Sequence, residues 1–331
     1  MGRVGAWLFV APALCAFGCK ASPAASLAGP GASPLAVAPP GSFAFEPTLF
    51  SAKRRIEPGD WMATHHERFE GFDAYTKKKP VRPTAARRVL VLQPLGPFEP
   101  AEAEIFETLR EYLSIYFQVE ARVAPPLPLP ATGFRTRGTG HFEYVQYRTD
   151  LLLGEVLAPR LPDDAIAYLG ITMADLYPDP SWNFAFGWAS LDRRVGVYSL
   201  DRYRPRYDGE PDTPATRRRT LRRALKVMAH ETGHMFSLPH CTFYECVMNG
   251  AETIEEVDRN VPWLCPLCLR KLHWNVGFDV RQRDRALRDF YARHDMQEEV
   301  EWLDRRIAYL RGPAAPPIAS GTVMASPARA P

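Results

Sequence analysis

The fold of this chain is decided by the stretch HETGHMFSLPHC, residues 230–241. His230 and His234 are four residues apart, so on a helix their imidazoles project from one face and can share one metal ion. Glu231 lies on the same turn but is rotated away, within reach of a metal-bound water without being a ligand. His240 follows six residues after His234, so the helix must end before it. We therefore predict a metal site with three histidine ligands and Glu231 as the general base.

One position in this stretch departs from a known pattern. The long metzincin motif reads His-Glu-x-x-His-x-x-Gly-x-x-His and is followed by a Met-turn, and this chain has Ser237 where the motif has glycine. Glycine suits that position because the helix ends there in a left-handed residue. We therefore predict a positive φ at Ser237, with a strain of about 1 to 2 kcal/mol. Ser237→Gly is expected to relieve this strain and to stabilise the domain by up to about 1 kcal/mol.

The three histidines favour a catalytic zinc site over a structural one. Neutral imidazoles bind Zn²⁺ well, and three of them leave a fourth position open for water. Zinc lowers the pKa of that water to about 7 and polarises a carbonyl group, so Glu231 can take the proton and hand it to the leaving amine. The alternative is a chance HExxH motif on a surface helix, against which His240 and the downstream Met248 argue.

Four cysteines follow the histidines in two clusters. Cys241 and Cys246 form the first, and Cys265 and Cys268 form a CxxC knuckle. Thiols in this arrangement are typical of a closed tetrahedral zinc site, so we expect two zinc ions per chain, one catalytic and one structural. Disulfides are the alternative, because exported proteins meet an oxidising compartment. A nucleic-acid-binding zinc finger has little support, since basic residues are sparse in this region.

The N-terminal residues have the pattern of an export signal. An uncharged apolar stretch follows Arg3, and the tetrapeptide AFGC that ends at Cys19 resembles a bacterial lipobox. We interpret residues 1–19 as a signal peptide, which is followed either by acylation of Cys19 or by simple cleavage. The chain is therefore expected to be exported, either to the periplasm or to a membrane as an anchored lipoprotein. Residues 20–56 are predicted to be a linker rich in proline and alanine, and residues 301–331 the end of a terminal helix and a disordered tail.

Between these ends the sequence alternates predicted strands and helices, which indicates a mixed α/β fold. Strands are expected where β-branched and aromatic residues form short apolar runs, and helices where apolar residues recur every three to four positions. The predicted strands are residues 88–96, 119–123, 165–172, 183–190 and 195–200, the last three forming a meander. The predicted helices are residues 101–117, residues 144–157, a helix that begins with Thr213 and Pro214 and leads into the histidine motif, and a helix or helix pair in residues 286–310.

The motifs from the histidine helix to the CxxC knuckle closely resemble the archaemetzincin family. Its signature comprises the HExxH helix, the third histidine, an adjoining cysteine, Cys-x-Met and a late CxxC, all present here. The resemblance implies a metzincin-like zincin domain over residues 57–300, with a mixed twisted sheet, an active-site helix and a C-terminal four-cysteine zinc-bound subdomain. It also implies a catalytic zinc on the three histidines, a structural zinc on the four cysteines, and Met248 as the Met-turn residue. Further similar segments are Gly59-Asp60-Trp61, Leu92 to Gly96, Gly170 to Thr172, Trp182 to Gly187 and Glu255 to Arg259.

The function that these observations predict is hydrolysis of peptide bonds by a zinc metallopeptidase acting on a peptide or protein. The alternative is a catalytically silent, zinc-bound protein that binds peptides or serves as a scaffold, against which the intact Glu231 argues. The net charge of +3, from 41 Lys+Arg and 38 Asp+Glu in 331 residues, gives no reason to expect a nucleic-acid partner, and we expect a monomer. Residues 183–190 form either a core strand only or, as the resemblance to metzincins implies, the strand above the cleft that binds an extended peptide along the sheet edge.

Several other polar residues are candidates for the site. For Tyr244, oxyanion stabilisation and core packing are both open, and its place between the cysteines favours packing. The remaining histidines have no partner at metal-ligand spacing and are expected to pack or to lie on the surface: His65, His66, His141, His273 and His294. For His65 and His66, a role in contacting the substrate is the alternative.

Overall fold

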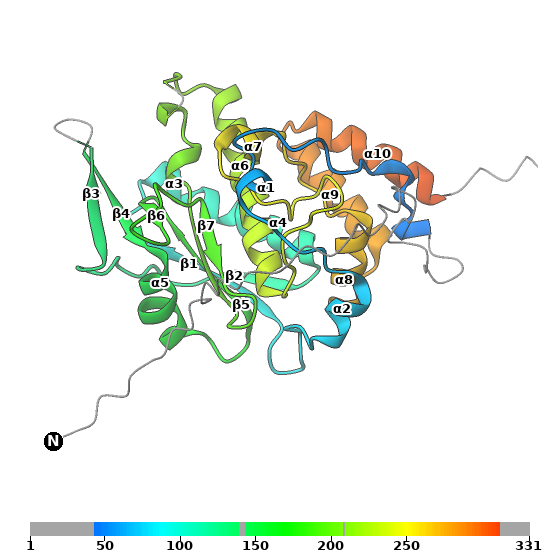
Figure 1. Ribbon diagram of the computed structural model, residues 1–331, viewed down its shortest axis with the longest axis horizontal. Coiled ribbons are helices and arrows are strands. Elements are labelled where there is room, and N and C mark those ends of the chain that lie inside the picture. The colour runs from blue at the N-terminus through cyan, green and yellow to red at the C-terminus, as the bar shows by residue number, and fades with distance from the viewer. Residues whose placement is uncertain (1–42, 139–142, 208, 312–331) are drawn as a thin grey trace, which may run out of the picture.

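The computed structural model describes residues 43–138, 143–207 and 209–311 (Figure 1). The strands in this part of the chain are β1 (Val89–Leu95), β2 (Glu120–Val123), β3 (Phe134–Arg137), β4 (Tyr144–Arg148), β5 (Ala165–Thr172), β6 (Asp175–Tyr177), β7 (Gly187–Ala189) and β8 (Val195–Ser199). Its α-helices are α1 (Trp61–Thr64), α2 (Phe72–Lys77), α3 (Pro100–Ala103), α4 (Ile105–Phe117), α5 (Thr149–Leu151), α6 (Pro214–Met235), α7 (Ile254–Arg259), α8 (Pro266–Val276), α9 (Val280–Arg293) and α10 (Gln297–Arg311). None of the helices in these ranges is long and apolar enough to cross a membrane.

A five-stranded mixed sheet, in the order β2-β1-β5-β8-β7, forms the centre of the domain. β1 runs parallel to β2 and β5, and β5 runs parallel to β8, whereas the edge strand β7 is antiparallel to β8. Every residue of β1, β5 and β8 is buried, as expected for parallel strands covered on both faces. The predicted mixed sheet is confirmed. The predicted meander is wrong, because the chain crosses over between β5 and β8 and the two strands run parallel.

A smaller sheet, in the order β3-β4-β6, lies beside the main one at one end of the molecule (Figure 1). β4 lies within the segment 144–157 that was predicted to be helical, and helical turns begin only at Thr149. The segment is extended because it pairs with β3 and β6, and because buried Gln146 donates a hydrogen bond to the Asp175 carboxylate at 2.7 Å. Of the predicted strand 183–190, only β7 is regular. In both cases pairing with distant residues overrides the local pattern.

Helices and helical turns cover both faces of the main sheet. On one face, α4 and α6 share a single core with the C-terminal helices and the cysteine region. On the other face, Val91, Leu95 and Tyr168 pack against Leu152 and Leu157 of a π-helical turn. The structure confirms the predicted helix at residues 101–117 as α3 and α4, the helix that enters the histidine motif as α6, and the C-terminal pair as α9 and α10.

Residues 43–56 pack against the domain, although the sequence predicts a linker there. Phe45 is 7% exposed and belongs to the main core, and Ala52 forms an antiparallel bridge with Tyr244. The Arg54 guanidinium donates to the Glu245 carboxylate at 2.9 Å. This part of the linker prediction is wrong, because contacts with residues far away in the sequence hold the segment in place. The predicted signal peptide with Cys19, the rest of the linker and the predicted tail from residue 312 lie outside the described residues.

Candidate metal centre

Helix α6 carries three of the predicted site residues to the floor of the domain's main cleft. The helix begins at Pro214, after the cap Thr213, and ends at Met235. His230 and His234 lie in its last turns, and the chain then reverses so that His240 faces them. One ligand atom from each histidine lies within 4.8 Å of the others. The structure therefore brings the three predicted ligands together, on a helix packed beneath β7 and β8.

Each of these imidazoles is oriented by a hydrogen bond at its Nδ1 atom. His230 Nδ1 lies 2.8 Å from the Val247 carbonyl oxygen, and His234 Nδ1 lies 2.7 Å from the Leu238 carbonyl oxygen. His240 Nδ1 contacts a side-chain carboxylate that is described below. Because these oxygens accept and do not donate, each Nδ1 carries the proton and each Nε2 presents a lone pair. Partners of this kind orient histidines that bind metals.

The lone pairs of these rings fit a zinc ion. His230 Nε2 and His234 Nε2 are 2.9 Å apart, and with both protons on Nδ1 neither ring can donate to the other. The two facing lone pairs repel each other, and a cation bound by both nitrogen atoms would remove that repulsion. Tetrahedral ligands at about 2.0 to 2.1 Å from zinc are about 3.3 Å apart. Burial lowers the pKa of His230 to about 3 and that of His234 well below its usual value. Both rings are therefore neutral, as metal ligands must be.

Glu231 is a buried carboxyl group beside the histidines. The residue is 5% exposed, and burial raises its pKa to about 8. The carboxyl group rests against the backbone of Gly187 on β7, since a Cβ atom at Gly187 would lie 2.5 Å from Glu231 Oε1. A glycine on the edge strand is thus required for Glu231 to occupy its place. A carboxyl group whose pKa is raised toward neutrality is suited to proton transfer near neutral pH.

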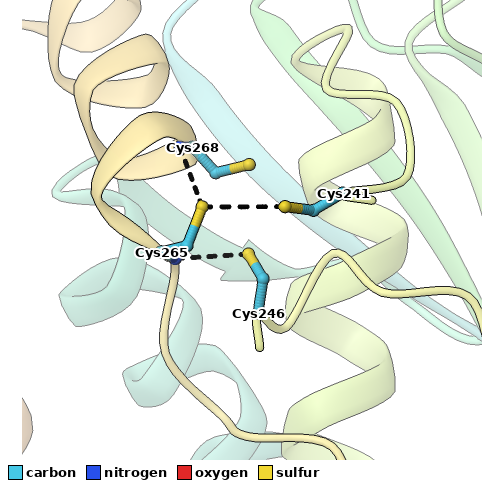
Figure 2. Close-up of side chains that lie close together, drawn as sticks. All are labelled: Cys241, Cys246, Cys265 and Cys268. Atoms are coloured by element: carbon cyan, nitrogen blue, oxygen red, sulfur yellow. Dashed lines mark hydrogen bonds between the residues drawn. The ribbon is translucent and has the colours of Figure 1, made fainter. Parts of the chain in front are cut away.

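The four predicted cysteines form a second cluster, and Figure 2 shows their sulfur atoms turned toward one another. Cys241, Cys246, Cys265 and Cys268 are buried free thiols whose Sγ atoms lie within 4.8 Å of one another. The Sγ atoms of Cys241 and Cys265 are 3.7 Å apart, which matches the spacing of about 3.8 Å for thiolates around a tetrahedral zinc ion. The backbone amides of Cys265 and Cys268 donate to the Sγ atoms of Cys246 and Cys265, which helps to orient these two sulfur atoms. The cluster fits zinc, and none of its sulfur atoms is in a disulfide.

The histidines open into a cleft of about 890 Å³. Its floor includes the catalytic end of α6, and one wall is formed by the segment that leads into β7 and by β7 itself. Trp61 and His65 also line the cleft, and their rings stack at a centroid distance of 3.6 Å. Trp182, in the segment that leads into β7, has its ring 6.0 Å from that of Trp61. A deep cleft with buried groups of shifted pKa at its floor is typical of an enzyme active site.

Known proteins are similar to this chain in sequence. A model of Peptidase family M54 matches residues 89–274. Archaemetzincin-2 of Macaca fascicularis is 33% identical over 291 residues, which cover 79% of this chain and 77% of that protein. Archaemetzincin-2 of Homo sapiens is 32% identical over 291 residues with the same coverage. This chain belongs to the archaemetzincin family.

The family confirms the predicted class of enzyme. Archaemetzincins are zinc metallopeptidases, so this chain is a hydrolase of that class with the α/β fold expected from its motifs. A solved archaemetzincin from Methanopyrus kandleri is 29% identical to this chain, covers 59% of it and 99% of its own length, and has a TM-score of 0.47.

Ser237, where this archaemetzincin departs from the metzincin pattern, has the predicted positive φ, at 63°. The residue is 4% exposed, and its hydroxyl group has two partners that the sequence does not reveal. It donates to the Leu191 carbonyl oxygen at 2.6 Å and accepts the Val81 amide at 3.0 Å. These bonds tie the end of α6 to two other segments. Because glycine would lose both bonds, we expect Ser237→Gly to destabilise the domain rather than to stabilise it.

The structure adds one carboxylate that no motif marks. Glu67 Oε1 contacts His240 Nδ1 and also accepts the Trp61 indole N–H at 2.7 Å. Burial opposes ionisation of Glu67, but hydrogen bonds from His240 and Trp61 outweigh it and lower the pKa of Glu67. Only the family-like segment Gly59-Asp60-Trp61 points to this part of the chain, because Glu67 is 173 residues away from His240.

Tyr244 and the remaining histidines lie in different parts of the structure. Tyr244 is 6% exposed and packs in the main core, as expected. His65 lines the cleft, so the substrate-side alternative stays open for it, whereas His66 is exposed. His273 packs against Phe45 and His294 packs against Phe290, and His141 lies outside the described residues.

Proposed function

We propose that this chain hydrolyses peptide bonds with a zinc ion held by His230, His234 and His240 and with Glu231 as the general base. The observation that carries the proposal is the convergence of the three histidines beside a buried carboxyl group at the floor of a large cleft. The zinc metallopeptidase class of the family supports the same chemistry.

The protein groups have separate roles in this reaction. A bound zinc ion supplies a Lewis acid that polarises the scissile carbonyl group and lowers the pKa of water to about 7. Glu231 accepts the proton of the attacking water and transfers it to the leaving amine. Burial raises the pKa of Glu231, which suits the group to proton transfer near neutral pH, and Gly187 gives it room. The hydrogen bonds at the Nδ1 atoms of the three histidines keep each Nε2 free to bind the ion.

The free edge of β7 supports the binding of an extended peptide. Beside β7, the Ser199 amide donates to the Phe186 carbonyl at 2.9 Å and the Ser190 amide donates to Val195 at 3.0 Å. In an antiparallel pair, the intervening odd positions 187 and 189 direct their N–H and C=O groups away from β8. These groups face the side of β7 on which the described part of the main sheet has no further strand, so a substrate strand can pair with them beside Glu231.

We further propose that the four cysteines hold a second, structural zinc ion. Four thiolates saturate a tetrahedral ion and leave no position for water. The loop between the first two ligands is held in place by Asn249, whose side-chain amide donates to the carbonyl oxygens of Cys241 at 2.6 Å and Tyr244 at 3.0 Å. A site of this kind contributes folding free energy rather than catalysis.

Glu231→Gln tests the catalytic assignment. The variant should hold as much zinc as the parent but hydrolyse a peptide library, read by mass spectrometry, about 10² to 10⁴ times more slowly, the usual contribution of a general base. The matched variant His234→Ala should lose both the catalytic zinc and the activity. Turnover retained by Glu231→Gln would refute the general-base role. A zinc-loaded parent that cleaves no peptide would favour the catalytically silent scaffold instead.

We also propose that the chain is exported and acts as a monomer, with Cys19 as the site of acylation. The first nineteen residues support export and acylation through their uncharged apolar stretch and the lipobox-like AFGC. Expression of the full chain in a bacterium should place it in the membrane fraction, and Cys19→Ala should release it. Sedimentation of the released form would show its oligomeric state. A chain that keeps its first residues and stays in the cytoplasm would refute export.

A further inference from the structure

Residues 57–67 reach the catalytic cleft from outside the region that the family model matches, residues 89–274. The segment is fixed to α7: the Glu256 carboxylate accepts the Trp61 backbone amide at 3.0 and 3.2 Å, and Asp60 forms an ion pair with Arg259 at 2.5 Å. The Trp61 indole lies on the backbone of Gly250, where a Cβ atom would be 2.4 Å from Trp61 Cδ1. The indole therefore has a defined position beside the histidines.

This position places Trp61 and Glu67 together on the third histidine. One carboxylate oxygen of Glu67 accepts from both the indole nitrogen of Trp61 and Nδ1 of His240. The Trp61 ring also packs edge-on against the His240 ring at a centroid distance of 5.1 Å. Two adjoining groups thus constrain the imidazole of His240, one through a hydrogen bond and one through ring packing.

His240 needs these constraints more than the other two histidines do. His230 and His234 are attached to a helix, and their Nδ1 partners are backbone carbonyl oxygens, which substitution does not remove. His240 follows the helix in an irregular segment, and its Nδ1 partner is a side chain. Without Glu67, His240 could turn, or carry its proton on Nε2, and in either case no lone pair would face the site.

We propose that Glu67, held by the Trp61 indole, is a positioning residue that fixes the tautomer and orientation of His240 and thereby sets the metal affinity of the catalytic site. The inference deepens the proposed function and rests on His240 being a ligand. Partners of ligating histidines typically contribute about 10- to 100-fold in metal affinity or activity.

Metal affinity measured on the full chain tests the inference without relying on turnover. Zn²⁺ and Co²⁺ binding would be measured by competition with a chelator for the parent, Glu67→Ala, Glu67→Gln and Trp61→Phe. We expect Glu67→Ala to weaken binding at the histidine site by about 10- to 100-fold. Glu67→Gln keeps a hydrogen-bond acceptor for His240 but loses the negative charge. Trp61→Phe keeps the carboxylate of Glu67 but removes the indole N–H that holds it. Both variants should therefore lose less metal affinity than Glu67→Ala. Thiolate-to-cobalt charge-transfer absorption should report an unchanged cysteine cluster.

Glu252→Gln is the matched control, because Glu252 lines the same cleft and bonds to α1 through Thr64 but contacts none of the three histidines. It should leave the affinity of the histidine site within about twofold of the parent. An equal loss in Glu252→Gln and Glu67→Gln would assign the effect to overall charge and overturn the inference. If Glu67→Ala folds and binds metal with the affinity of the parent, the inference is also overturned. If Glu67→Ala does not fold, parental affinity in both Glu67→Gln and Trp61→Phe overturns it. Failure of the general-base test with Glu231→Gln would leave these affinities unchanged, so the two proposals fail separately.

Discussion

Ser237→Gly should destabilise the domain, although glycine is the residue that the metzincin pattern has at this position. The φ of 63° strains a residue that has a Cβ atom by about 1 to 2 kcal/mol, and glycine would remove most of that strain. The same substitution removes the hydroxyl group that donates to the Leu191 carbonyl oxygen and accepts the Val81 amide. The outcome depends on which of the two effects is larger.

The lost hydrogen bonds outweigh the relieved strain. Each bond contributes about 1 kcal/mol, and the cost rises to about 1 to 3 kcal/mol where a buried partner is left unpaired. Glycine adds a further cost of about 0.4 to 1 kcal/mol, because it increases the conformational freedom of the unfolded chain. With the strain relief subtracted, we expect the free energy of unfolding to fall by about 1 to 3 kcal/mol.

Urea unfolding of the zinc-loaded protein would measure this change. Ser237→Ala, which loses the hydroxyl group but keeps the strain, should be less stable still. Asp295→Gly is the matched control: its φ is 54°, its side chain is 84% exposed, and it has only an ion pair at 3.9 Å with Arg218. That variant should have parental stability or gain up to about 1 kcal/mol. A gain of the same size in Ser237→Gly would refute the reasoning.

Three further predictions concern the cleft, the cysteines and a buried lysine. Gly187→Ala should keep zinc but slow hydrolysis about 10²-fold by displacing the Glu231 carboxyl group, and a parental kcat would contradict the packing. Serine at both Cys265 and Cys268 should unfold or aggregate the domain, whereas a stable, zinc-free, active variant would disprove the structural zinc. Burial lowers the pKa of Lys226 from 10.5 to about 8. As the pH rises from 8 through 10.5, the free energy of unfolding of the parent, measured with urea, should therefore increase by up to about 3 kcal/mol relative to that of Lys226→Met. A difference between the two proteins that does not change with pH would exclude this titration.

The sequence predicts the parts of the site that local spacing encodes. The histidines four residues apart on a capped helix, the turn forced before His240 and the CxxC knuckle are all short-range patterns. The buried strands β1, β5 and β8 are recognisable because a covered parallel strand is apolar at nearly every position. In these segments local propensity and tertiary structure favour the same conformation.

The parts that sequence analysis misses depend on contacts between distant residues. β4 is a strand because β3 and β6 flank it, and residues 43–56 are ordered because they pack on the loop that contains Tyr244. Glu67 and the hydroxyl partners of Ser237 are likewise brought to the site by tertiary folding alone. None of these residues belongs to a motif with a defined spacing, so neither periodicity nor composition identifies them.

His240 is the point at which these long-range contacts meet. It lies beyond the end of α6, and three separate features hold it: the left-handed turn at Ser237, the neighbouring Cys241 in the cysteine cluster, and the carboxylate of Glu67. His230 and His234 need none of these, because helix α6 itself sets their spacing. Changes at any of the three features should therefore weaken the third ligand first and leave the helical pair in place. The family motif names the three ligands, and we expect these long-range contacts to determine how firmly the third one is held.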